Sequence, residues 1–462
     1  MKAVIRASVD IEASDLKKII ERLFVFSARK ISELHKIWNF KNGSPVITRA
    51  GTYTSREWTN WTQGFFFGMP LLQYDFDNDK KFLELGYLGT ASQMPVYLTD
   101  FAVHDHGFNV VSTYGNLLRL SYEGRLDEIS HQADSYKLAL KVSGAVQAMR
   151  WTELSDELGY IYSFNGRHSL FADTIRSLRS LAVAHQLGHV LIDERGRRID
   201  LLRRLIQHAE ITARYIVYLG EERDIYDVPG RVAHEAIFNV DSRTFRCPST
   251  QQGYSPFSTW TRGMAWILCG YAEELEFITH LGNSELEPFG GKDQILKRYR
   301  GVAESVADFY IANTPTDGIP YWDTGAPGLS ELGDYLNRAA DPFNDYEPVD
   351  SSAAVIAAQG LIRLGNFMIG SGDTEKGNTY LATGLTVAGN VLSEPYLSSD
   401  PRHQGLILHS VYHRPRGWDY VLPGKKNPSG EASMWGDYHA LELALLIYRI
   451  GERKKYPTFF SK

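Results

Sequence analysis

Apolar residues recur along most of this 462-residue chain at the spacing of an amphipathic α-helix. In one such segment, Phe171, Ile175 and Leu178 share a single helical face. Alternation typical of β-strands is scarce outside residues 213–240, so the sequence predicts an all-α protein. The twelve predicted helices span residues 12–37, 58–75, 78–96, 108–122, 125–147, 170–187, 200–219, 258–281, 293–313, 350–366, 373–394 and 434–450.

Aromatic, acidic and histidine residues gather before or at the start of the even-numbered predicted helices, and the odd-numbered helices show nothing comparable. A ring of helical hairpins explains this alternation, because its even helices run in one direction and their N-termini share one rim. We therefore expect an (α/α)6 toroid of six inner and six outer helices around a funnel. The residues concerned are Trp58, Trp61 and Gln63; His104 and Asp105; Asp173; His234 to Trp266; Tyr321 to Ser352; and Trp435 to Tyr438.

No linker rich in Pro, Gly or Ser divides the chain, and no repeat of fixed period is visible. We expect one barrel domain over residues 1–462, in which residues 1–50 include an N-terminal helix and its connection. The 43% hydrophobic content supplies a large core, and the net charge of −6 argues against a nucleic-acid surface. No stretch approaches the roughly 18 uninterrupted apolar residues of a membrane helix.

The two cysteines, Cys247 and Cys269, are too few for a disulfide framework and lack the spacing of a zinc site. We expect no metal and no organic cofactor. The first residues contain no apolar segment typical of an export signal, which favours a cytoplasmic protein. A periplasmic location stays open if a signal was removed, and the oligomeric state is not predicted.

One short run, QQGYSPFSTWTRGMAW over residues 251–266, combines Gln252, Trp260, Arg262 and Trp266. Indole faces stack on sugar rings, and the planar guanidinium of Arg262 suits a carboxylate. This combination predicts a cleft for an acidic saccharide. The alternative is a buried aromatic core in which Arg262 pairs with a structural acid.

Two carboxylates, Asp105 in HDHGF and Asp173 in SLFADT, stand at predicted helix starts. Saccharide chemistry commonly needs one carboxyl that donates a proton and another that stays charged. A helix N-terminus lowers the pKa of Asp173, so aromatic neighbours or Asp105 close by would have to raise it for a general acid. The alternative is that both residues cap their helices.

Further candidates lie on segments that join the helices. His234 could orient a hydroxyl or a water, or serve a structural role. Tyr321 and Trp322 form a second stacking group on a loop rich in Gly and Pro. The basic segment 413–430, which includes Arg416, could recognise a sulfate or carboxylate on a neighbouring sugar, or be a solvated loop.

Several separate motifs together resemble the unsaturated glucuronyl hydrolases of glycoside hydrolase family 88. The resemblance runs from about Trp58 to about Ile450, and the motifs are specific in this order and at these intervals. They are WTQGFFFGM, HDHGF, FADTIRSLRSLAVAHQLG, QQGY with TWTRGMAW, PYWD, VDSSAAVIAAQGL and WGDYHALELAL.

The resemblance implies an (α/α)6 barrel and an enzyme that removes the 4,5-unsaturated uronic acid which polysaccharide lyases leave at a non-reducing end. It implies that Asp173 is the acid/base residue, that Asp105 is the supporting carboxylate, and that water adds across C4=C5. It implies no cofactor. Positions that match the terminal-sugar subsite are His234, Gln252, Trp260, Arg262 and Trp266, with Trp61 as a further stacking residue.

The chain departs from the family pattern at a few positions. His106 stands where the family often has a hydrophobic residue, and Met264 replaces a more usual Gln. Arg176 and Arg179 follow Asp173 where an Asn is common, and we expect at least one of them to point outward. These changes leave both carboxylates intact but put the substrate preference in doubt.

Three alternatives remain open at the level of sequence. The sister family of unsaturated rhamnogalacturonyl hydrolases, glycoside hydrolase family 105, shares the fold and chemistry but has a different neighbouring sugar. A sugar epimerase would need paired histidines, whereas the histidines here are scattered. A non-catalytic glycan-binding protein would need only the aromatic cleft. The parent polysaccharide and the tolerance of sulfate are not predicted.

Overall fold

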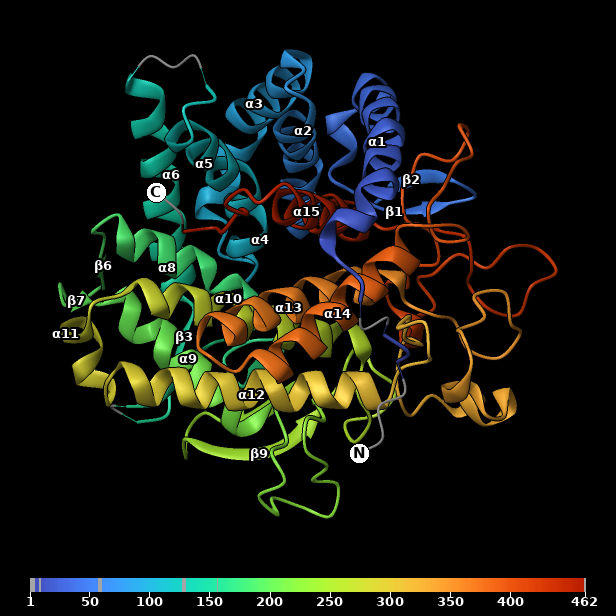
Figure 1. Ribbon diagram of the computed structural model, residues 1–462. Coiled ribbons are helices and arrows are strands. Elements are labelled where there is room, and N and C mark those ends of the chain that lie inside the picture. The colour runs from blue at the N-terminus through green and yellow to red at the C-terminus, as the bar shows by residue number, and fades with distance from the viewer. Residues whose placement is uncertain (1–4, 8–9, 57–59, 127–129, 156, 461–462) are drawn as a thin grey trace.

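The computed structural model describes residues 5–7, 10–56, 60–126, 130–155 and 157–460 (Figure 1). Six inner positions form a closed ring, because each packs on the next and the last packs on the first. The inner helices are α2 (Gln63–Asp77), α4 (His106–Val110) continued by α5 (Asn116–Tyr122), α7 (Thr174–Ser177) continued by α8 (Arg179–Gln186), α10 (Thr261–His280), α13 (Ser351–Gly370) and α15 (Met434–Gly451).

Outer helices cover this ring, and each packs on an inner neighbour. They are α1 (Lys17–Ile37), α3 (Lys80–Gln93), α6 (Ser130–Met149), α9 (Leu201–Tyr215), α12 (Lys292–Ala312) and α14 (Thr374–Val391), with a short α11 (Asn283–Leu286) between α10 and α12. All twelve predicted helices are present, and the inner ones are the even-numbered ones. The (α/α)6 prediction is therefore confirmed.

Burial distinguishes the two rings. The inner helix α10 is buried on every side from Thr261 to Ile278, as expected for a helix with neighbours all round. The outer helix α9 buries one stripe that includes Leu205 and Ala209, and its N-cap Asp200 accepts a hydrogen bond from the backbone N–H of Leu202. Amphipathic segments thus form the outside and apolar segments the inside.

The inner helix α13 is long and apolar enough to cross a membrane by length and composition, but 78% of that apolar window is buried inside the protein. It contacts α10, α14 and α15. Its Arg363 reaches Glu276 of α10 with an N–O distance of 2.9 Å. These contacts are those of a barrel core helix.

Two inner positions are interrupted. A π-helical turn, η5 (Val111–Gly115), separates α4 from α5. The break at Leu178 separates α7 from α8, yet both Arg176 and Arg179 are buried. The expectation that one of these arginines points outward is wrong, because residues three apart share a helical face and both face acids of the barrel core.

Those acids are Glu273 of α10 and Glu442 of α15. Arg176 donates to both oxygens of Glu273 at 3.0 Å and to Glu442 at 2.7 Å. Arg179 lies 3.8 Å and 3.7 Å from the same two acids and donates to the carbonyl of Gly107. The two guanidinium groups therefore neutralise carboxylates inside the ring and leave no added charge for the funnel.

Short strands occur in more places than residues 213–240, which corrects that expectation. Three hairpins pair β1 (Pro45–Arg49) with β2 (Thr52–Ser55), β3 (Trp151–Glu153) with β4 (Gly159–Ile161), and β6 (Leu191–Ile192) with β7 (Arg198–Ile199). A three-stranded sheet has the order β5 (Ser169–Phe171), β8 (Glu235–Asn239), β9 (Thr244–Ser249). Strands of two to six residues are too short to show alternation in a sequence.

Candidate active site

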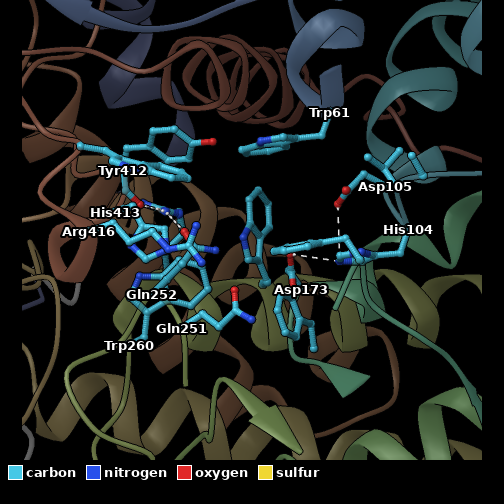
Figure 2. Close-up of a pocket in the computed structure, with 17 residues that line it drawn as sticks. Trp61, His104, Asp105, Asp173, Gln251, Gln252, Trp260, Tyr412, His413 and Arg416 are labelled. Carbon is cyan, nitrogen blue, oxygen red and sulfur yellow. Dashed lines mark hydrogen bonds and ion pairs between the residues drawn. The ribbon is translucent and has the colours of Figure 1, made fainter. Parts of the chain in front are cut away.

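A cavity of about 230 Å³ opens at the rim formed by the N-termini of the inner helices (Figure 2). Its wall is rich in aromatic rings and includes two arginines, and Figure 2 shows Asp105 and Asp173 on the side away from Arg416. The residues that line it are Trp61, Ala102, Val103, His104, Asp105, Phe164, Phe171, Asp173, Gln251, Gln252, Trp260, Arg262, Trp266, Tyr412, His413, Arg416 and Trp418.

A close approach of two helices brings Asp105 and Asp173 together. Gly107, in the first turn of α4, lies against α7, where an added Cβ would stand 2.3 Å from the carbonyl oxygen of Ser177. The backbone N–H of Gly107 donates to the hydroxyl of Ser177 at 2.9 Å. Asp105 directly precedes α4 and Asp173 directly precedes α7, so this contact fixes the two carboxylates at the same point of the rim.

Neither carboxylate caps its helix. Asp105 and Asp173 hold the N-cap positions of α4 and α7, but their side chains make no capping hydrogen bond. The backbone N–H of His106 bonds instead to the side chain of Gln147 at 3.2 Å. The capping alternative is therefore excluded for both residues. By contrast, Asp350 does cap α13, because its side chain accepts a hydrogen bond from the backbone N–H of Ser352 at 3.1 Å.

The surroundings give the two carboxyls different proton affinities. Burial raises the pKa of Asp105 to about 6, against the opposing effect of His104. Burial also raises the pKa of Asp173, but the His104 imidazole outweighs it and the pKa ends below its ordinary value. The protein without substrate thus holds Asp173 as the charged member and Asp105 as the member more easily protonated.

His234 stands directly behind the cavity wall. The sheet places it there, because its carbonyl accepts a hydrogen bond from Ala172 next to Asp173 at 2.9 Å. Its Nδ1 accepts from the backbone N–H of Gln251, and burial lowers its pKa to about 4, so the ring is neutral with its proton on Nε2. That Nε2 has no hydrogen-bond partner among the described residues.

Arg262 lines the cavity, but its hydrogen bonds are already taken. Its Nη1 donates to Asp350 at 2.8 Å and to the carbonyl of Val411, and its Nη2 donates to Gln252 Oε1 at 2.9 Å and to the carbonyl of Tyr412 at 2.8 Å. The residue is 1% exposed. Arg262 therefore pairs with a structural acid, Asp350, as the alternative interpretation of the sequence has it. Its guanidinium holds Gln252 in place instead of offering both Nη groups to a substrate carboxylate.

Three of the predicted tryptophans, Trp61, Trp260 and Trp266, lie in the wall. Trp61 stacks on Trp435 with ring centroids 5.1 Å apart. Trp260 stands edge-on to His234 at 4.8 Å, and Trp266 is buried between Phe108 and the barrel core. These rings give the cavity the flat apolar faces that a sugar ring needs. Trp58 lies outside the described residues.

Tyr321 and Trp322, which the sequence predicts as substrate contacts, are not in the wall. Both are buried, and their carbonyls accept hydrogen bonds from Thr261 at the start of α10. The indole N–H of Trp322 donates to Glu347 at 2.7 Å. The motif holds the N-terminus of α10 in place, so its effect on the cavity is indirect.

Some wall residues carry little or no signal of their own in the sequence. His104 gives a signal only through its neighbour Asp105, and Phe164 gives none. Arg416 and His413 come from the basic segment 413–430 and lie across the cavity from His104 in Figure 2, and Trp418 of the same segment also lines the cavity. Of its four basic residues, only Arg416 reaches the wall.

A metal could be held at one group of side chains among the residues that the structure describes. His104, Asp105 and Asp173 offer ligand atoms within 4.8 Å of one another. The His104 Nε2 lies 3.8 Å from Asp105 and 3.6 Å from Asp173. An imidazolium between two carboxylates accounts for the same geometry, so the distances alone do not require an ion.

No protein-family model matches the chain. Two curated relatives are unsaturated glucuronyl hydrolases. That of Formosa agariphila is 25% identical over 391 residues, covering 83% of this chain and 78% of the relative. That of Bacillus sp. strain GL1 is 26% identical over 411 residues, covering 87% and 90%. An unsaturated chondroitin disaccharide hydrolase of Streptococcus agalactiae is 23% identical and covers 85% of this chain and 82% of its own.

Solved structures share the fold. The unsaturated glucuronyl hydrolase of Bacillus sp. GL1 superposes with a TM-score of 0.69 at 22% identity, covering 94% of this chain and 97% of its own. A heparin-specific unsaturated glucuronyl hydrolase gives 0.70 at 19% identity, covering 95% and 100%.

The ring of hairpins and the paired carboxylates in an aromatic cavity define a glycoside hydrolase of the (α/α)6 class. Two relatives that align with most of the chain are unsaturated glucuronyl hydrolases, a narrower class of enzyme. Over most of its length the chain is similar to unsaturated glucuronyl hydrolases, the family whose motifs its sequence resembles.

Proposed function

We propose that the protein removes a 4,5-unsaturated uronic acid from the non-reducing end of oligosaccharides that polysaccharide lyases produce. The observation that carries this proposal is the meeting of Asp105 and Asp173 in one aromatic-walled cavity. Relatives in the same family are named for unsaturated glucuronyl substrates, which supports the glucuronyl over the rhamnogalacturonyl alternative.

The reaction is a hydration. A carboxyl of the pair gives its proton to C4, and a water oxygen bonds to C5 while the C4=C5 double bond is lost. The remaining proton of that water returns to the carboxylate pair, so the enzyme is unchanged. The product is a hemiketal at C5, which opens to a ketone and releases the neighbouring sugar from C1.

Asp173 is the residue that exchanges this proton, and the substrate itself prepares it for the task. Its pKa is lowered in the empty cavity. An entering uronate adds a negative charge next to it, and a like charge raises the pKa of a carboxyl. The proton held by the pair is then available at Asp173, while Asp105 takes the charge.

The wall residues bind the terminal ring. Trp61, Trp260 and Trp266 supply stacking faces, and the anchored Gln252 keeps its amide nitrogen for the ligand, since its oxygen already accepts from Arg262. The His234 Nε2, which has no hydrogen-bond partner among the described residues, is the donor for a hydroxyl or for the attacking water.

A spectroscopic assay tests the proposal. Incubation with unsaturated disaccharides should abolish the near-ultraviolet absorbance of the conjugated enol-carboxylate, because hydration removes the double bond. Dialysis against a chelator should leave this activity unchanged, since the carboxyl pair carries the proton without an ion. Absorbance that persists across glycosaminoglycan, ulvan and pectic substrates contradicts the proposal, and activity that a divalent ion restores contradicts the metal-independent chemistry.

A further inference from the structure

His104 lies at the centre of the carboxylate pair, although the mechanism above assigns it no task. Its Nε2 is 3.8 Å from Asp105 Oδ1 and 3.6 Å from Asp173 Oδ2. Dashed lines in Figure 2 mark both ion pairs. One nitrogen therefore faces both carboxylates. Each distance is just beyond a hydrogen bond, so a small rotation of either side chain closes it.

The imidazole is held in place by packing rather than by hydrogen bonds. It is 1% exposed, its edge meets Phe171 at 5.5 Å, and it stacks near Phe164 at 6.1 Å. Neither ring nitrogen has a hydrogen-bond partner among the described residues, and neither does Asp173 Oδ1. A buried polar ring without partners is costly for stability, so a role at the carboxylates explains why it is there.

The charges around His104 favour its protonated form. Burial lowers its pKa, but Asp105 and Asp173 raise it more, and the pKa lies above its ordinary value despite Arg150. The other titratable groups that face it are the buried rings of His106, His208 and His234. Burial lowers the pKa values of these three to about 4, 3 and 4, which keeps them neutral.

We propose that His104 is a positioning residue whose Nε2, between the two carboxylates, keeps one proton within the Asp105–Asp173 pair and holds the negative charge at Asp173 until the entering uronate moves the proton there. This assignment rests on the proposed function for its meaning in catalysis. Asp105 and Asp173 then titrate as a coupled pair, so each observed pKa belongs to the pair and not to one residue alone.

The consequence is a shift of pH dependence when the imidazolium is removed. A positive charge within about 4–6 Å lowers the pKa of a carboxyl by roughly 1–3 units, so its loss raises both values of the pair. In His104→Gln and His104→Phe, the bell-shaped profile of kcat/KM against pH should move upward by about one pH unit. The phenylalanine variant keeps an aromatic ring between Phe164 and Phe171.

His106→Gln is the matched control. His106 is a buried histidine in the same motif, but it bonds to the hydroxyl of Ser143 at 3.0 Å and to the carbonyl of Asp100 at 2.8 Å. It does not line the cavity. Its replacement should leave both limbs of the pH profile in place, whatever it does to stability.

A titration that does not depend on turnover completes the test. Aspartate labelled with ¹³C at the carboxyl is followed by NMR in the wild type, in both His104 variants and in His106→Gln, with Asp105→Asn and Asp173→Asn to assign the signals. The carboxyl pKa of Asp173 should rise in the His104 variants only. Thermal denaturation selects the His104 variant that melts as the wild type does.

An unchanged Asp173 titration in a folded His104 variant overturns the inference, and so does a pH profile that moves equally in His106→Gln. If the wild type turns over none of the unsaturated substrates, the proposed function fails. The NMR titration still decides the role of His104 in that case, so the two failures are distinguishable.

Discussion

Asp173 combines a partly buried side chain, an unbonded oxygen and a neighbouring imidazole, and none of these serves its helix. We therefore predict that Asp173→Asn keeps the fold and the binding of substrate but lowers kcat by about 10²–10⁴-fold, because an amide neither gives nor takes the proton. The measurement is the rate of absorbance loss at saturating disaccharide, together with the dissociation constant of the same disaccharide.

Asp317→Asn provides the control for that variant. Burial raises the pKa of Asp317 to about 6, as it does for Asp105, but Asp317 does not line the cavity. Its replacement should affect stability and not kcat. Turnover near the wild-type rate in Asp173→Asn would remove Asp173 from the mechanism.

At the scale of single residues, the sequence predicts the candidate catalytic carboxylates better than it predicts which residues bond to the other members of the site. Asp105 and Asp173 are identifiable because each opens a helix within a specific motif. The hydrogen bonds of Arg262 cannot be identified from the sequence. Its partners Asp350 and Val411 lie 88 and 149 residues further along the chain and meet it only when the ring closes. For the same reason, Tyr321 and Trp322 have the composition of a sugar platform but support α10 from behind.

Among the elements, the contact between α4 and α7 determines the distance between the two carboxylates. Gly107→Ala would place a Cβ 2.3 Å from the Ser177 carbonyl oxygen, so the helices must separate. We expect a loss of about 1–3 kcal/mol in the free energy of unfolding. A displacement near 1 Å at the carboxylates would lower kcat/KM by about 10²-fold.

Gly301→Ala is the control for this substitution. Gly301 lies within the outer helix α12, and an added Cβ there meets nothing within 4 Å. The change should stabilise the protein by up to about 1 kcal/mol, because alanine favours the helix. Urea unfolding and kcat/KM are measured for both variants, and equal behaviour of the two would show that the α4–α7 contact does not set the site.

The segment 413–430 brings one cation to the cavity. Arg416 lies over the ring of Trp418 at 5.3 Å and forms no ion pair with an acid among the described residues. We predict that Arg416→Ala lowers kcat/KM by about tenfold for disaccharides with a sulfate or carboxylate on the second sugar, and much less for neutral ones. The ratio of the two kcat/KM values is the measurement.

Lys425→Ala is its control, because Lys425 belongs to the same segment but does not line the cavity. The ratio should be that of the wild type in this variant. If Arg416→Ala changes both substrates equally, the segment is a solvated loop without a role in selection.

Element by element, periodicity predicts the helices because each buries a stripe or a whole surface over many turns. It does not predict the π-helical turn at Val111–Gly115 or the break at Leu178, since the apolar pattern continues through both. Periodicity does not predict the pairing of β5 with β8 either, and this pairing brings His234 beside Asp173. Local pattern thus predicts the scaffold, and long-range pairing completes the site.

At the scale of the whole molecule, the buried acid Glu274 makes the free energy of unfolding depend on pH. Glu274 of α10 is 1% exposed, and neither carboxyl oxygen has a hydrogen-bond partner among the described residues. Burial, with the charge of Glu273, raises its pKa well above the ordinary value. The folded protein therefore binds a proton there that the unfolded chain releases above about pH 4.5.

Because the folded pKa is raised, this stability is fully present below the unfolded pKa and is lost as the pH rises towards the folded value. Relative to Glu274→Gln, the wild type should lose about 1.4 kcal/mol of unfolding free energy per pH unit across that window. Urea unfolding at several pH values between 5 and 8 measures the difference. Parallel curves for the two proteins would show that Glu274 is charged in the folded state.

The closure of the inner ring by α15 against α2 has a consequence for how the protein is made. The strand β1, near the start of the chain, bonds to the residues just before α15, and Trp61 stacks on Trp435 of that helix. During synthesis, α15 therefore emerges only after the other five inner positions of the ring. A product truncated before α15 carries Asp105 and Asp173 but lacks the helix that closes the ring. A stop codon ahead of α15 should accordingly abolish activity, although both carboxylates are still made.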